Sequence, residues 1–260
     1  PIVERPFGDL IKFDVQGRKP MARQILVVAP MSGHYATLLR STVTSLLPDA
    51  DIFVTDWHNA RDIPVSAGKF DIEDYTLYVA DFIEHLGPSV HVVAVCQPVP
   101  LTLAATAYLA EKKPEAQPTT LTLIGGPVNP DAAATDVTDF GRRITMGQLE
   151  EMAIQRVGFN HKGAGRMVYP VDGHMVDMGK ITTVAVKIVE GEKDDISAPG
   201  QCLAALDLLT GLPDSKKASH LEPGAGHYGI FAGKSWRSNI RPLVLDFIDS
   251  NSTDNVTRLH

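Results

Sequence analysis

The chain has 260 residues, of which 44% are hydrophobic and 21% charged, and this length and composition suit one globular domain with a substantial core. The formal net charge of −7 and the lack of a basic stripe argue against nucleic acid as a partner, because phosphate binding needs clustered positive charge. No apolar run approaches the roughly 20 residues of a transmembrane helix. We therefore predict a single domain, residues 1–260, without a membrane span.

Short apolar runs alternate with helical stretches along the chain. Most runs are nearly continuous, as strands buried on both faces require. The predicted strands are 25–29, 51–55, 90–95, 120–124, 183–189 and 218–222, with an antiparallel edge strand at 10–13. The predicted helices are 35–47, 72–86 behind an Asp71 cap, 100–112, 199–209 and 235–250. This order predicts an α/β fold, a mainly parallel sheet with helices on both faces.

One long segment shows neither a strand pattern nor a helix pattern. Residues 125–179 are rich in glycine and methionine and show no clear strand pattern. Insertions at this point of such a fold commonly cover the site, so we predict a cap region within the domain at 127–180. An ordinary surface excursion is the competing interpretation.

The cysteine that follows the 90–95 strand is the first candidate for catalysis. The run Val93-Ala94-Val95-Cys96-Gln97-Pro98 leads directly into a helix of small residues. An α/β-hydrolase carries its nucleophile at this position, on a sharp strand-to-helix turn whose next backbone N–H points at the oxyanion. The predicted nucleophile is therefore Cys96 and the predicted donor is Gln97. A buried cysteine that only packs is the alternative.

Two later loops supply partners for Cys96, in the chain order that this fold uses. The run Glu190-Gly191-Glu192-Lys193-Asp194-Asp195 follows a predicted strand, and its spacing from the glycine favours Asp194 over Asp195 as the orienting acid. His227 lies in the glycine-rich turn 224–229, where an unhindered backbone can aim an imidazole at the sheet edge. His227 is the predicted base, and Asp194 is predicted to fix its tautomer.

The loop after the 25–29 strand is expected to supply the second oxyanion donor. The backbone N–H of Met31 is favoured over that of Ser32, which could instead cap the following helix. Substrate contacts are predicted at Ser32, Trp57 and Tyr228, around a shallow, open cleft. The histidine spacing predicts no metal site, and the two distant cysteines predict no disulfide and a reducing compartment.

Five segments together resemble the intracellular polyhydroxyalkanoate depolymerases of bacteria, which are α/β-hydrolases with a cysteine nucleophile. These segments are 28–40, 56–64, 94–98, 190–196 and 226–229. The resemblance covers nearly the whole chain. It implies a Cys96, Asp194 and His227 triad, a polyhydroxybutyrate-type polymer or oligomer as substrate, and a cytoplasmic location on storage granules.

The chain differs from that family in two ways. Family members carry an additional N-terminal segment, whereas this sequence begins at Pro1, so we expect a fragment or a processed form. They also carry a long helical insertion near 168–170, so we expect the cap here to be shortened or missing.

The leading hypothesis is hydrolysis of the polyester through a thioester on Cys96, releasing a 3-hydroxyacid or oligomers. No cofactor is predicted, although coenzyme A could replace water as the acyl acceptor. A synthase-like acyltransferase is the first alternative, but synthases favour a glycine-flanked cysteine and this chain has Ala94 and Pro98. A catalytically silent granule-binding homologue is the second. The sequence leaves the oligomeric state open.

Overall fold

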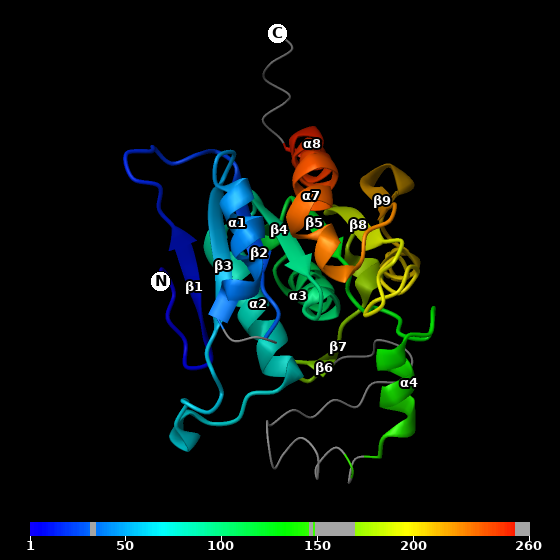
Figure 1. Cartoon of the computed structure of the whole chain (residues 1–260). Helices are drawn as coiled ribbons and strands as arrows, with labels where there is room; N and C mark the ends of the chain where they lie inside the picture. The colour runs from blue at the N-terminus through cyan, green and yellow to red at the C-terminus, as the bar shows by residue number, and fades with distance from the viewer. Residues whose placement is uncertain (32–34, 146–147, 149–169, 253–260) are drawn as a thin grey trace.

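The structure, a computed structural model, describes residues 1–31, 35–145, 148 and 170–252. The described residues form a seven-stranded sheet in the order β1-β3-β2-β4-β5-β8-β9 (Figure 1). Neighbouring strands run parallel except at one edge, where β1 is antiparallel to β3. The predicted α/β fold with an antiparallel edge strand is therefore confirmed. The strands of this sheet are β1 (Gly8–Phe13), β2 (Gln24–Val28), β3 (Asp51–Trp57), β4 (Val90–Val95), β5 (Thr120–Ile124), β8 (Ala185–Gly191) and β9 (Lys217–Glu222).

The central strands are buried on both faces, which explains their continuous apolar sequence. Every residue of β4, β5 and β8 is buried. Lys187 in β8 is buried as well, and its ammonium lies 5.5 Å from the centre of the Phe247 ring in the last helix.

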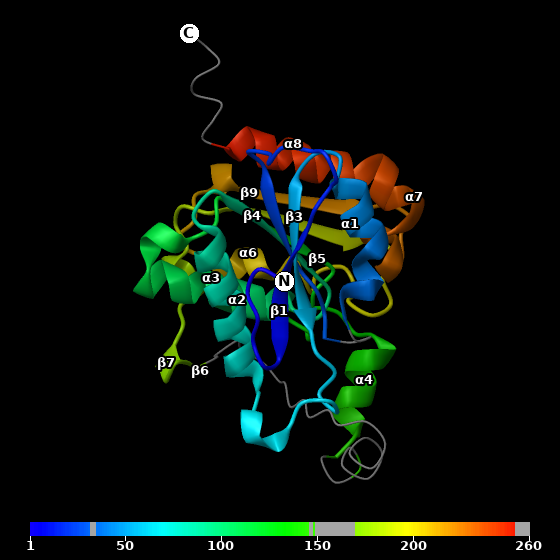
Figure 2. The same ribbon diagram turned by 90° about the vertical axis from the view of Figure 1, so that its left-hand side faces the viewer.

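Helices cover both faces of the sheet. Figure 2 shows α2 and α3 on one face and α1, α7 and α8 on the other. On the second face, the Thr42 hydroxyl donates to the Phe231 carbonyl oxygen and the Trp236 indole donates to Ser45. These bonds fix α1 against the C-terminal helices. The α-helices are α1 (Arg40–Leu46), α2 (Ile72–Leu86), α3 (Val99–Lys112), α4 (Asp136–Arg143), α6 (Ala205–Leu208), α7 (Gly233–Ser235) and α8 (Arg241–Asn251).

Three of the five predicted helices are more broken than their sequences indicate. The segment 199–209 is mostly turns and reaches α-helix only in α6, because the buried Glu190 carboxylate accepts the N–H groups of Gly200, Cys202 and Leu203. The segment 35–47 begins as a 3-10 turn, and 235–250 contains a π-helical turn before Pro242, which lacks an N–H to continue the pattern. The turns are η1 (Tyr35–Leu39), η2 (Val65–Ala67), η3 (Pro114–Ala116), η5 (Met178–Lys180), η6 (Asp214–Lys216), η7 (His227–Ile230) and the π-helical η8 (Trp236–Ile240).

The predicted cap region, 127–180, is described at 127–145, 148 and 170–180. It contains α4 and a hairpin of β6 (Pro170–Val171) and β7 (His174–Met175). Asp172 and Gly173 both have positive φ, as the tight hairpin turn of an Asp-Gly pair requires. Glu73 of α2 accepts the Gly173 N–H at 3.2 Å, so the end of this region is docked on the helical layer. The covering role and the domain bounds remain predictions.

Candidate active site

Cys96 lies in a strained turn between β4 and α3. Its φ of +66° is in the left-handed region, which costs a residue other than glycine about 1–2 kcal/mol. The turn is held in place because the Cys96 N–H donates to the Ile124 carbonyl at 2.8 Å and the Val99 N–H donates to the Cys96 carbonyl at 3.1 Å. The Cys96 side chain is half-buried. This is the backbone geometry that presents a nucleophile above the carboxyl edge of a parallel sheet.

His227 and Asp194 form a buried pair at the same edge. The imidazole Nδ1 donates to Asp194 Oδ2 at 2.7 Å, and the two side chains are 3% and 0% exposed. The other carboxylate oxygen accepts the N–H groups of Ile196 and Ser197 at 2.9 and 2.8 Å. Asp195, by contrast, is exposed. The carboxylate is therefore fixed by three donors, and its orientation toward the histidine is set by its own loop.

The environment of His227 favours its protonated form. Burial opposes the charge, but hydrogen bonds with Asp194 and then with Cys96 outweigh it and raise the pKa of His227 to about 9. Because Nδ1 is bonded to Asp194, Nε2 is the nitrogen that faces the thiol. The structure thus brings together three of the predicted site residues, from the loops after β4, β8 and β9. Such a set can form an imidazolium beside a thiolate.

Two consecutive glycines that follow β5, Gly125 and Gly126, lie close to this site. Gly125 has a φ of +56°, and a Cβ there would lie 3.4 Å from Asp194 Oδ2, 3.5 Å from His227 Cε1 and only 2.6 Å from Ile230 Cδ1. A Cβ on Gly126 would lie 2.1 Å from Val99 Cβ, at the start of α3. Gly125 needs glycine because of its positive φ and its contact with Ile230 beside Asp194 and His227, and Gly126 needs it because its backbone packs against Val99. A Gly-Gly pair after a buried strand was the available signal.

The predicted oxyanion donors are at the ends of β2 and β4. Gln97 directly follows Cys96 and is half-buried, and Met31 packs against the core two residues after Ala29. Within the described residues, the N–H groups of Met31 and Gln97 donate no hydrogen bond to the protein. In the described part of the chain, neither N–H is occupied by a protein acceptor. Ser32, the alternative to Met31, lies outside the described residues.

The other two predicted substrate contacts, Tyr228 and Trp57, differ in exposure. Tyr228 is 59% exposed, with its ring centroid 5.7 Å from that of His227, so it lies at the surface beside the site. Trp57 is 2% exposed and stacks on Tyr75 at 4.1 Å in the core. The expectation that Trp57 lines the cleft is corrected, because a side chain sealed in an aromatic cluster offers no surface to a substrate.

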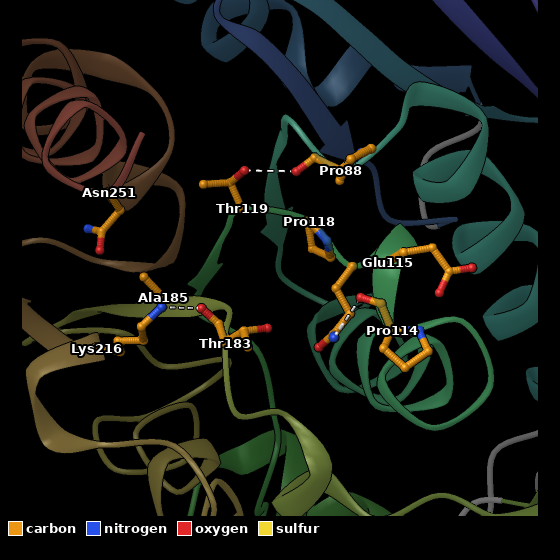
Figure 3. A pocket seen from close by; sticks show the side chains of 10 residues that line it. Pro88, Pro114, Glu115, Pro118, Thr119, Thr183, Ala185, Lys216 and Asn251 are labelled. Carbon is orange, nitrogen blue, oxygen red and sulfur yellow. Dashed lines mark hydrogen bonds between the residues drawn. The ribbon is translucent and has the colours of Figure 1, made fainter. Parts of the chain in front are cut away.

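A separate hollow shown in Figure 3 is not part of this site. It is lined by Pro88, Thr119 and Lys216, which precede β4, β5 and β9, and by Asn251 at the end of α8. It therefore lies at the amino ends of the strands, opposite to Cys96. Among the described residues, no group of three or more His, Cys, Asp or Glu side chains could hold a metal ion. No helix in the described ranges is long and apolar enough to cross a membrane.

The sheet order, the strand-to-helix turn and the buried Asp–His pair define the chain as an α/β-hydrolase. Solved structures support this class at low sequence identity. A monoacylglycerol lipase of Paleococcus ferrophilus is 13% identical, with 93% of this chain and 98% of that chain covered and a TM-score of 0.58. A meta-cleavage product hydrolase of Pseudomonas fluorescens IP01 is 12% identical, with 94% of both chains covered and a TM-score of 0.60. A putative lipase of Acinetobacter baumannii AYE is 13% identical, with 95% of this chain and 93% of that chain covered and a TM-score of 0.60.

A family model narrows the class. Residues 125–171 and 171–252 match the family described as "PHB de-polymerase C-terminus". The matched residues include Asp194 and His227, so this part of the chain is similar to the polyhydroxybutyrate depolymerase family. No curated protein matches the sequence. Fold and family together support ester hydrolysis as the chemistry of the chain.

Proposed function

We propose that the protein hydrolyses a polyhydroxybutyrate-type polyester through a thioester on Cys96. The observation that carries this proposal is the buried Asp194–His227 pair, which lies at the same sheet edge as Cys96 on its left-handed turn. The family match to residues 125–252 supports the polyester as substrate.

In the first half of the reaction, the Cys96 thiolate attacks an ester carbonyl carbon of the polymer. The negative charge that develops on the carbonyl oxygen is held by the N–H groups of Gln97 and Met31. His227 then gives its Nε2 proton to the departing alkoxide, which leaves as the hydroxyl end of the neighbouring unit. Asp194 holds the imidazole in the tautomer that this step needs.

In the second half, His227 removes a proton from water, and the resulting nucleophile attacks the thioester carbon. The carbon–sulfur bond breaks, a 3-hydroxyacid or oligomer leaves, and the imidazolium and thiolate are restored. Coenzyme A in place of water would give an acyl thioester instead of an acid. The proposed place of action is the surface of storage granules in the cytoplasm.

The test is incubation with amorphous polyhydroxybutyrate granules, with and without coenzyme A, followed by identification of the released products by mass spectrometry. Free 3-hydroxybutyrate or its oligomers support hydrolysis, and a coenzyme A ester supports thiolysis. Cys96→Ala provides the matched control, because it removes the sulfur and leaves the rest of the site. Equal product release by Cys96→Ala would refute the proposal.

A further inference from the structure

Four side chains hold both ends of the loop that carries Met31. On its first side, the Ala29 carbonyl oxygen accepts two hydrogen bonds, from Trp57 Nε1 at 2.8 Å and from the Tyr75 hydroxyl at 3.0 Å. The Ala29 N–H donates to Thr55 Oγ1 at 2.9 Å. On the far side, the Ala36 N–H donates to Asp56 Oδ1 at 2.8 Å.

These contacts come from the end of β3 and from α2, not from the loop itself. Trp57, Tyr75 and Thr55 are 2%, 3% and 0% exposed, so they bind the backbone in a dry environment where a hydrogen bond orients strongly. Burial raises the pKa of Tyr75 well above its usual range, so the phenol remains a donor at any working pH. The stacked rings of Trp57 and Tyr75 leave neither donor free to turn away.

We propose that Trp57 and Tyr75 are positioning residues that aim the Met31 N–H at the oxyanion formed on Cys96. This inference rests on the proposed function, since it assigns a purpose to the loop within that reaction. A carbonyl that accepts two donors is fixed in rotation, and Met31 is two residues away along a chain stiffened by Pro30. A shift of an ångström at such a donor is enough to slow acyl transfer.

The decisive variant is Tyr75→Phe, which removes one hydroxyl and keeps the stacked ring. The assay is the stopped-flow burst of p-nitrophenolate from p-nitrophenyl butyrate, which reports acylation of Cys96 without a polymer. We expect the burst rate at saturating ester to fall about 10-fold with KM changed less than about 2-fold, because the lost contact acts in the transition state.

A second measurement distinguishes a misplaced Met31 N–H from a general disturbance of Cys96 and His227. Alkylation of Cys96 by iodoacetamide needs the thiolate and His227 but no oxyanion donor, so its rate should equal that of the wild type in Tyr75→Phe. Tyr78→Phe is the matched control, because Tyr78 is on the same helix, lies in the same ring cluster and hydrogen-bonds the Phe7 backbone instead. It should keep a burst rate within about 2-fold of the wild type.

Two outcomes overturn the inference: a Tyr75→Phe burst as fast as that of the wild type, or a parallel loss of the alkylation rate. A wild-type protein that gives no burst, or is acylated away from Cys96, refutes the proposed triad itself. The failure of the aiming role and the failure of the proposed function are thus distinguishable in one set of measurements.

Discussion

Replacing Asp194 by Asn should remove a pH dependence of stability that the wild-type protein owes to His227. The folded-state pKa of His227 is raised from 6.5 to about 9. Because the folded protein holds this proton more tightly, the stabilisation is fully present below pH 6.5 and is lost as the pH rises to about 9. A difference of this size corresponds to about 3 kcal/mol between the two protonation states at most.

Asp194→Asn takes away the largest of the contributions that raise this pKa, while burial continues to lower it. An amide oxygen can still accept the Nδ1–H, but it carries no charge to favour the imidazolium. We therefore expect the difference in the free energy of unfolding between pH 6 and pH 9.5 to shrink by about 2 kcal/mol in the variant. Turnover should fall by several orders of magnitude.

Urea unfolding at the two pH values, followed by tryptophan fluorescence, measures the change. Titration of the His227 Cε1 proton by NMR checks its origin. Asp195→Asn is the matched control, because Asp195 is adjacent and exposed, and it should keep the wild-type pH dependence and nearly the wild-type turnover. An unchanged pH dependence in Asp194→Asn, or a larger effect at Asp195, would refute the reasoning.

Other variants test the geometry around the pair. Cys96→Gly should abolish turnover yet raise the free energy of unfolding by about 1 kcal/mol in urea melts, because glycine adopts a φ of +66° without strain; a marked loss of stability would contradict this. Gly125→Ala should lower stability by about 2 kcal/mol or more and slow turnover at least about 10-fold, since its Cβ meets Ile230 and lies against Asp194; a stable, fully active variant would argue against the close packing seen there. Glu190→Gln should lower the melting temperature and slow turnover, because a neutral amide holds the three N–H groups of the 200–203 turn less strongly. In the granule assay, Tyr228→Ala should reduce polymer hydrolysis more than hydrolysis of a small ester, and equal losses would exclude a polymer contact.

The strands and the loops that carry Cys96, Asp194 and His227 could be predicted from the sequence because each follows a local rule. Buried parallel strands are continuous apolar runs, and a nucleophile, an acid and a histidine that each follow a strand must meet at one sheet edge. The spacing from Gly191 favoured Asp194 over Asp195, and in the structure it is Asp194 that contacts His227.

The predictions that the structure corrects failed because they depend on contacts between segments far apart in the sequence. The segment 199–209 has a helical composition. Its backbone N–H groups at Gly200 and Cys202 nevertheless bind the carboxylate of Glu190 in β8 instead of continuing a helix. Trp57 follows the predicted strand 51–55 as a site residue would, but in the structure it is the last residue of β3. It contacts Ala29 and Tyr75, which the sequence around Trp57 does not reveal.

The unequal burial of the two cysteines has a consequence for oxidative stress. Cys202 is fully buried, and burial raises its pKa to about 12, so it is inert and cannot act as a resolving thiol for Cys96. Peroxide would convert Cys96 to a sulfenic acid that no intrachain disulfide can protect, and further oxidation would be irreversible. We expect glutathione added together with peroxide to cap Cys96 as a mixed disulfide, so that activity is lost but returns when a reductant is added, and peptide mass spectra should place the modification at Cys96. Under the proposed function, an oxidised cell would stop hydrolysing its polyester and resume once its thiol pool recovers.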